Sequence, residues 1–192
     1  MGTVKSLLLG MCFVLGACTS QTSTVQTTEK GTQWEWQNGT IVVKTPERPA
    51  GQKSVLGLTT PKLEAVRVGF VGLGMRGPGA VERFTYIPGT QVVALCDYEE
   101  ARADKCQELL KKASMPKAAV YSGDKGYEEL CKRDDIDLVY IAADWLHHFP
   151  VAKCALENGK NVAIEVPSAM NLQECWDLIN LSESTRKHCF IL

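Results

Sequence analysis

The stretch from Val66 to Gly77 constrains the fold most, because an apolar run ends there in three glycines spaced G-x-G-x-x-G. This pattern predicts a β-strand, a tight turn and then a helix. Gly72 would permit the turn, Gly74 would let the backbone approach a pyrophosphate, and Gly77 would let the helix pack closely against the strand. Free N–H groups at the helix start would attract the phosphate charge. The motif alone also fits a glycine-rich turn without a ligand, since 16 of the 192 residues are glycine.

An acidic residue follows the glycines at the spacing of a dinucleotide site. Residues 90–96 form a second apolar strand pattern, and Asp97 ends it, 97 − 77 = 20 residues after Gly77. A carboxylate at this place can accept hydrogen bonds from an adenosine ribose. Tyr98 comes next and no arginine is adjacent, so we predict NAD rather than NADP, because the carboxylate would repel a 2′-phosphate. The alternative is that Asp97 caps the next helix.

Apolar runs and helical patterns alternate from Val66 to Leu192. Strands are predicted at 66–71, 92–96, 119–121, 138–142, 162–165 and 189–192. Helices are predicted from near Arg76, over 99–113 and 127–132, from Pro150 to 158, and over 171–185. The fourth strand is too apolar to have a solvated face, which is typical of parallel sheets. Residues 66–192 therefore indicate an α/β fold, a Rossmann-type doubly wound parallel sheet with strand order 3-2-1-4-5-6.

The first 32 residues carry a targeting pattern. Lys5 precedes an apolar run at 7–15 of signal-peptide length, and Leu15-Gly16-Ala17-Cys18 resembles a bacterial lipobox. We therefore expect residues 1–17 to be a lipoprotein signal peptide and Cys18 to be acylated, which would anchor an exported protein to a bacterial membrane. An ordinary signal peptide cut nearby is the alternative. Residues 18–32 are rich in Thr, Ser and Gln, which predicts a disordered tether.

Residues 33–65 are expected to form a small hairpin and an irregular connection. Asn38-Gly39 is a strong turn signal, and Trp34 and Trp36 precede it two residues apart, on one face of a strand. Those rings need a cover, so we expect the hairpin to pack on the main domain or on a partner. A platform that stacks against sugars is the rival interpretation.

Composition excludes some classes of function. The chain is 45% apolar and 22% charged, as in ordinary globular proteins, and its net charge of −1 argues against a nucleic-acid partner. The folded part contains six cysteines without a C-x-x-C pair or zinc spacing, and we interpret them as buried thiols rather than disulfides. They are Cys96, Cys106, Cys131, Cys154, Cys175 and Cys189.

Ligands of such sheets lie beyond the carboxyl ends of the strands, so the residues there are candidates for binding. After the fourth strand come Trp145, Leu146, His147 and His148, and the fifth strand ends in Glu165-Val166-Pro167. Trp145 could cover a nicotinamide or ribose, and His148 could donate to the cofactor. A core tryptophan and a capping histidine are the alternatives. Two adjacent histidines at a helix start would point differently, which argues against a shared metal.

These motifs together resemble the Gfo/Idh/MocA-like oxidoreductase superfamily, and most closely its branch glycoside hydrolase family 109, the NAD-dependent α-N-acetylgalactosaminidases. The resemblance covers residues 66–192, the cofactor domain alone. It implies NAD contacts from the pyrophosphate turn, the ribose acid, the start of the fourth helix and the nicotinamide end. The implied residues are Met75 and Arg76, then Asp97, then Trp145, Leu146, His147 and His148, then Glu165 and Val166.

One position departs from the dehydrogenases that this superfamily contains. They usually carry Glu-Lys-Pro where this chain has Glu165-Val166-Pro167, and a valine cannot move a proton. The glycosidase branch is therefore favoured, which implies a terminal α-N-acetylgalactosamine-type glycan as substrate. Its chemistry is transient oxidation at C3 of the sugar, elimination, water addition and re-reduction, an exception to the usual pair of carboxylates.

The resemblance assigns the sugar-handling residues to a second domain, so we expect no catalytic residue in this chain and no activity from it alone. Two alternatives stay open: a sugar oxidoreductase of the same superfamily, and an NAD-binding module without catalysis. Homo-oligomer formation is also left open.

Overall fold

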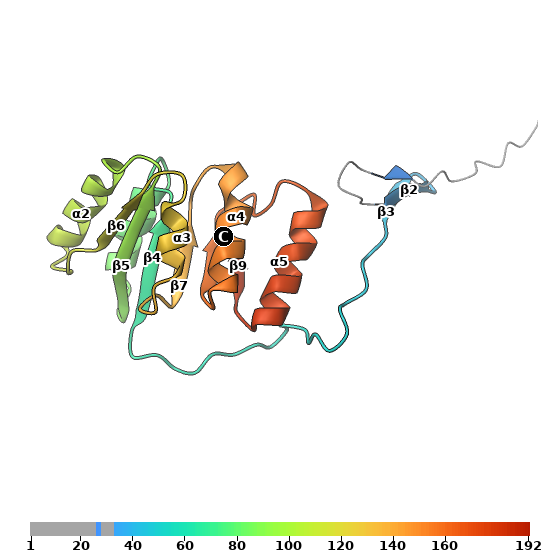
Figure 1. Ribbon diagram of the computed structural model, residues 1–192, viewed down its shortest axis with the longest axis horizontal. Coiled ribbons are helices and arrows are strands. Elements are labelled where there is room, and N and C mark those ends of the chain that lie inside the picture. The colour runs from blue at the N-terminus through green and yellow to red at the C-terminus, as the bar shows by residue number, and fades with distance from the viewer. Residues whose placement is uncertain (1–25, 28–32) are drawn as a thin grey trace, which may run out of the picture.

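The computed structural model describes residues 26–27 and 33–192, so the predicted signal peptide, Cys18 and most of the predicted tether lie outside the described residues. Strands and helices alternate along the chain from Val66 onward (Figure 1). The strands are β1 (Gln26–Thr27), β2 (Gln33–Gln37), β3 (Thr40–Val43), β4 (Val66–Val71), β5 (Thr90–Asp97), β6 (Ala119–Ser122), β7 (Leu138–Ile141), β8 (Asn161–Ile164) and β9 (Cys189–Ile191). The helices are α1 (Gly77–Thr85), α2 (Arg102–Lys112), α3 (Gly126–Cys131), α4 (Trp145–Glu157) and α5 (Leu172–Thr185).

The main sheet has six parallel strands in the order β6-β5-β4-β7-β8-β9. Counted along the chain from β4, this is the predicted order 3-2-1-4-5-6, so the doubly wound Rossmann fold is confirmed. The order reverses beside β4, where the chain first runs outward to β5 and β6 and later returns to β7. The crevice of such a sheet opens at this reversal, beyond the carboxyl ends of β4 and β7.

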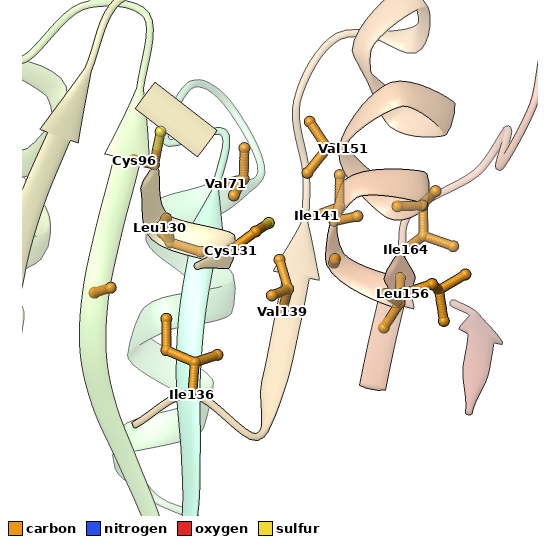
Figure 2. Packing of buried hydrophobic residues seen from close by; sticks show 14 of the residues in the cluster. Val71, Cys96, Leu130, Cys131, Ile136, Val139, Ile141, Val151, Leu156 and Ile164 are labelled. Carbon is orange, nitrogen blue, oxygen red and sulfur yellow. The ribbon is translucent and has the colours of Figure 1, made fainter. Parts of the chain in front are cut away.

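Both faces of the four central strands β5, β4, β7 and β8 are largely buried, because these strands carry apolar side chains on both sides of the sheet. On one face the strands pack against α1 and α2, through Phe70, Leu95 and Leu110 among others. On the other face Val139, Ile141 and neighbouring residues pack against α3, α4 and α5 (Figure 2). Each large apolar side chain buried in this way contributes about 1.5–3 kcal/mol.

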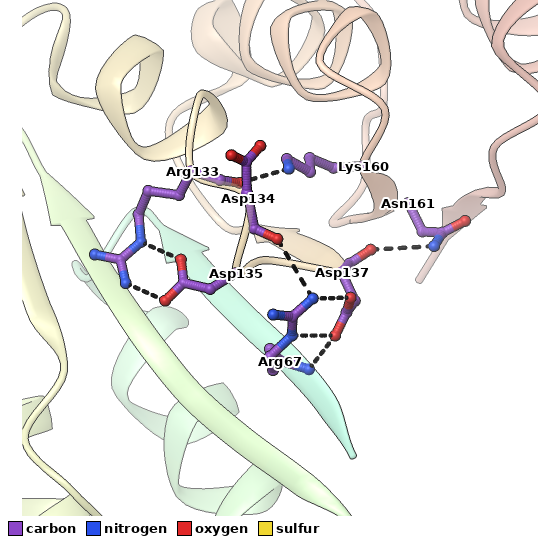
Figure 3. A network of polar contacts seen from close by, with 7 residues as sticks. All are labelled: Arg67, Arg133, Asp134, Asp135, Asp137, Lys160 and Asn161. Carbon is purple, nitrogen blue, oxygen red and sulfur yellow. Dashed lines mark hydrogen bonds and ion pairs between the residues drawn. The ribbon is translucent and has the colours of Figure 1, made fainter. Parts of the chain in front are cut away.

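A network of polar contacts joins the amino ends of the central strands, opposite the crevice (Figure 3). Asp137, just before β7, accepts hydrogen bonds from the main-chain N–H and the guanidinium of Arg67 at 2.7–2.9 Å. These bonds from Arg67 hold the pKa of Asp137 below its usual value, although partial burial acts in the opposite direction. Asn161 of β8 donates to the Asp137 carbonyl at 3.1 Å. The network therefore fixes β4, β7 and β8 to one another.

The irregular connection after β3 is held against α5. Arg48 forms a two-bond ion pair with Glu183, at 2.9 and 3.0 Å, and Gln52 donates to the same carboxylate at 2.9 Å. Arg186 donates to the carbonyls of Lys53 and Ser54. Glu183 is only 4% exposed, so the connection covers this end of α5.

The predicted hairpin forms, but it does not pack on the main sheet. Asn38 and Gly39 adopt positive φ angles of 49° and 78°, which suits the tight turn between β2 and β3. Trp36 and Ile41 are 56% and 53% exposed, and the hairpin stands apart from the main sheet (Figure 1). Packing on the main domain is therefore wrong for the described residues, whereas packing on a partner stays a prediction. The short strand β1, which pairs with β2, lies in the segment predicted as tether.

Two further local differences have physical causes. Helix α4 begins at Trp145 rather than at Pro150, because the Asp144 side chain accepts from the Leu146 N–H and caps the helix five residues earlier.

Among the cysteines, all six in the described part of the chain are free; Cys96, Cys106 and Cys131 are buried as predicted, whereas Cys175 is exposed. Within the described residues, no helix has the length and apolarity to cross a membrane.

Candidate cofactor site

A pocket of about 890 Å³ opens at the carboxyl ends of the central strands. Its volume is within the usual range for small-molecule sites. All but one of the predicted site residues line it, although they come from four separate stretches of the chain. These are Gly72, Gly74, Met75, Arg76, Asp97, Trp145, Leu146, His147, His148, Glu165 and Val166. Gly77 lies behind them at the start of α1, where it is buried.

The glycine turn at the base of the pocket requires glycine for steric reasons. Gly72 has a φ of +92°, and a Cβ there would lie 2.3 Å from the main-chain nitrogen of Ala143. A Cβ on Gly77 would lie 2.1 Å from the Gly72 carbonyl oxygen, so α1 can start this close to β4 only with glycine.

Gly74 differs from the other two glycines. A Cβ there would have one neighbour within 4 Å, the Arg102 Nη1 at 3.7 Å. The main chain at Gly74 is therefore open toward the pocket, and a ligand could fill the space that a side chain would take. This open backbone beside the α1 N-terminus fits the pyrophosphate of a dinucleotide.

Asp97 is 6% exposed and is bonded on both carboxylate oxygens. Oδ2 accepts from the Leu73 N–H at 2.6 Å, so the acid ties the end of β5 to the glycine turn. Oδ1 accepts from the Glu99 N–H at 3.0 Å and from Arg102 Nη1 at 3.2 Å. The bond from Glu99 is a local turn contact and not the helix cap that was the alternative, because the N-cap of α2 is Ala101 and has no side-chain cap bond. Asp97 also lines the pocket wall.

The start of α4 forms the opposite rim. Asp144 caps the helix, and the His147 Nδ1 lies 2.6 Å from its Oδ2. Burial raises the pKa of Asp144, but the hydrogen bonds from His147 and from the Leu146 and His147 N–H groups outweigh it, and the pKa lies below its usual value. Trp145 and Leu146 are 61% and 72% exposed, so Trp145 is a rim residue and not a core tryptophan.

The expected role of His148 as a donor to the cofactor does not agree with its contacts. The ring is 1% exposed, and its Nδ1 lies 2.7 Å from the Pro167 carbonyl oxygen. Its Nε2 lies 2.9 Å from the Ala143 carbonyl oxygen. Both ring nitrogens thus lie within hydrogen-bond distance of main-chain carbonyls, with the donor set by the tautomer, and the ring joins the loop after β8 to the start of α4. His148 lines the pocket as a positioning residue for these loops.

Glu165 and Val166 complete the rim after β8. The Tyr140 hydroxyl donates to Glu165 Oε1 at 3.0 Å, and burial, followed by this bond, raises the pKa of Tyr140. The Glu165 carboxylate is therefore held in place from within the sheet. Val166 is 58% exposed, precedes the cis peptide to Pro167, and presents an apolar side chain to the pocket.

Sequence reasoning overlooked several residues that line the same pocket. They are Tyr98, Arg102, Gly123, Asp124, Tyr127, Asp144 and Val151. Gly123 and Asp124 directly follow β6, so the rule that ligands lie beyond strand ends would have found them had it been applied to the third strand. Arg102 gives a weaker signal, because it lies five residues after Asp97 and reaches the pocket only from the first turn of α2.

Known proteins resemble this chain in sequence and fold. Residues 66–192 match the sequence profile of a family described as an oxidoreductase family with an NAD-binding Rossmann fold. The chain is 80% identical over 193 aligned residues to glycosyl hydrolase family 109 protein 4 of Phocaeicola vulgatus; the alignment covers 100% of the chain but 37% of the relative.

Two solved structures extend the comparison. One is a biliverdin reductase from Synechocystis with biliverdin and NADP+, at 26% identity and a TM-score of 0.56, over 66% of this chain and 37% of that one. The other is myo-inositol dehydrogenase from Lactobacillus casei with NAD(H) and myo-inositol, at 25% identity and a TM-score of 0.54, over 62% and 34%. The likeness supports a nicotinamide cofactor, and these two relatives differ in whether it carries the 2′-phosphate.

Proposed function

The chain belongs to the oxidoreductase family with an NAD-binding Rossmann fold, and on this premise we propose that it is the cofactor domain of an NAD-dependent glycosidase. It is similar along its whole length to proteins named glycosyl hydrolase family 109, but it spans only 37% of the relative at 80% identity. The activity and substrate of the whole protein are therefore part of the proposal.

The observation that carries the cofactor role is the open main chain at Gly74. Gly74 lies three residues before the start of α1 and lines the same pocket as Asp97, together with residues at the ends of the central strands. Gly72 and Gly77 build the turn, and Gly74 leaves space for a pyrophosphate. Asp97, held by the Leu73 N–H, faces the same pocket and would accept from the adenosine ribose.

Val166 favours a glycosidase over a dehydrogenase. It lines the pocket at the position where related dehydrogenases are expected to place a lysine, and its side chain has no proton to transfer. When bound, the nicotinamide would accept a hydride from the sugar and return it, so that no net oxidation occurs. In this domain Trp145 would cover the cofactor at the rim, and Glu165, fixed by Tyr140, would face its nicotinamide end.

The test uses a protein of the relatives' full length that carries this domain, purified with its bound cofactor. We expect hydrolysis of a p-nitrophenyl α-N-acetylgalactosaminide without accumulation of reduced nicotinamide. Removal of the cofactor should abolish hydrolysis, and oxidised NAD should restore it. Steady formation of reduced nicotinamide from the free sugar would favour the oxidoreductase alternative, and hydrolysis by cofactor-free protein would refute the proposal.

We also propose that the protein is exported and anchored through Cys18, on the sequence pattern alone. Incorporation of labelled fatty acid by cells that express the protein, lost in the Cys18→Ala variant, is the expected result. Equal labelling of both proteins would contradict the anchor.

A further inference from the structure

The acid at the end of β5 is one member of a cluster of three charged side chains, Asp97, Arg102 and Glu99. Arg102 bridges the two carboxylates: its Nη1 lies 3.2 Å from Asp97 Oδ1 and its Nη2 lies 2.8 Å from Glu99 Oε1. The exposed fraction of the side chain rises along the cluster, from 5% for Asp97 to 44% for Arg102 and 59% for Glu99. The cluster thus extends from the buried end of the strand to the solvent.

Arg102 lies where the two candidate cofactors differ. It lines the pocket together with Gly74 and Asp97, and its Nη1 would be 3.7 Å from a Cβ on Gly74. The guanidinium therefore lies between the pyrophosphate turn and the acid that would hold the adenosine ribose. In Rossmann folds an arginine near this acid is what accommodates the 2′-phosphate of NADP.

The guanidinium has the chemistry to bind a phosphate, but one N–H on each of its terminal nitrogens is already used. A free arginine offers a planar fork that suits two phosphate oxygens. Here one arm of the fork is directed at Asp97 and the other at Glu99. A 2′-phosphate would therefore meet two carboxylates and an arginine that must first release one of them.

Of the two carboxylates, Glu99 is the one that can affect the choice of cofactor without also supporting the glycine turn. Asp97 also accepts from the Leu73 and Glu99 N–H groups, so its replacement would disturb the glycine turn. The Glu99 side chain is exposed, and an exposed ion pair contributes little to folding stability.

We propose that Glu99 is a specificity-determining residue, which selects NAD over NADP by occupying the arm of Arg102 that would otherwise bind the 2′-phosphate. This proposal rests on the proposed cofactor site and adds the residue that chooses between the two cofactors. Glu99 acts through Arg102 and touches neither the nicotinamide nor the pyrophosphate.

Isothermal titration calorimetry with oxidised NAD and oxidised NADP, performed on the complete gene product after cofactor removal, tests the proposal. We expect Glu99→Gln to shift the ratio of the two dissociation constants toward NADP by about two- to fivefold, the effect of one exposed ion pair that the phosphate no longer has to displace. Adding Arg102→Gln to this variant should remove the shift.

Glu100→Gln is the matched control, because it removes the same charge from the neighbouring residue, which contacts Ser122 at 3.4 Å. The control should leave the ratio unchanged. An unchanged ratio in Glu99→Gln, or an equal shift in Glu100→Gln, would overturn the proposal while leaving the cofactor site intact. A wild-type protein that binds NADP as tightly as NAD would also overturn it. Failure of the wild-type protein to bind either nucleotide would refute both the cofactor site and the role of Glu99.

Discussion

Replacement of Gly74 by alanine separates the proposed cofactor role of the glycine turn from its role in folding. The backbone at Gly74 does not have a positive φ, and the added Cβ would meet only the end of the Arg102 side chain, at an ordinary contact distance of 3.7 Å. Nothing in the described fold has to move. The free energy of unfolding should therefore stay within about 0.5 kcal/mol of the wild-type value.

Cofactor affinity should fall, because the methyl group would fill the space that the pyrophosphate approaches. If the phosphate retreats and loses one hydrogen bond between charged and main-chain groups, the loss is about 1.5–3 kcal/mol. That energy corresponds to binding about 10- to 150-fold weaker.

Calorimetric titration with oxidised NAD measures the affinity, and urea unfolding measures the stability. Gly79→Ala is the matched control: it also adds one methyl group, in α1, where the nearest atom is Arg83 Nη1 at 3.7 Å. This control should bind NAD normally and gain about 0.5–1 kcal/mol of stability, because alanine is the better helix former. Gly72→Ala is the variant expected to disrupt folding. Its Cβ would overlap the main chain of Ala142 and Ala143, so this protein should not fold. Unchanged NAD affinity in Gly74→Ala would refute the placement of the pyrophosphate.

Two further predictions concern stability and thiol chemistry. Asp137→Asn should cost about 1–2 kcal/mol at neutral pH by weakening hydrogen bonds to a charged partner. Because the folded pKa of Asp137 is lowered, its stabilisation is present above the carboxyl's ordinary pKa and is lost as the pH falls through the folded value. Urea midpoints of wild type and variant should therefore converge in acid, and a pH-independent difference would contradict this. A maleimide should label exposed Cys175 in the native protein but Cys96 and Cys106 only after unfolding, because burial raises the pKa of these thiols to about 12 and about 11. Mass spectrometry of the labelled peptides decides the order, and early labelling of Cys106 would contradict it.

The sheet could be predicted from sequence because its signals are local. A strand buried on both faces is a continuous apolar run, and the turn at Gly72 leaves no alternative to glycine. The strand order then follows from the rules by which alternating strands and helices connect in a doubly wound parallel sheet. The residues beyond the strand ends were also found in this way, since the chain itself places them at one rim.

The contacts that define the site's chemistry could not be predicted, because they join residues distant in sequence or depend on helix phase. The His148 ring is fixed by the Pro167 carbonyl, 19 residues away, and no pattern near His148 reveals it. Arg102 reaches Asp97 because α2 starts at Arg102, three residues later than expected. The exposure of Trp36 was missed because alternation in a strand shows which residues share a face but not whether another element covers that face.

Asp137 and Asp97 each accept three hydrogen bonds, and they lie at opposite ends of the strands of the main sheet. This separation makes their roles distinguishable by mutation. Asp137 fixes the amino ends of β4 and β7, away from the pocket, so its loss should lower stability without changing cofactor affinity. Asp97 both ties β5 to the glycine turn and faces the pocket, so its replacement would change folding and binding together. A fall in NAD affinity in Asp97→Ala would therefore not distinguish a lost ribose contact from a displaced turn. Gly74 and Glu99 lie on either side of Asp97, and because each can be replaced without removing a bond to the turn, they isolate the pyrophosphate and the ribose ends of the site.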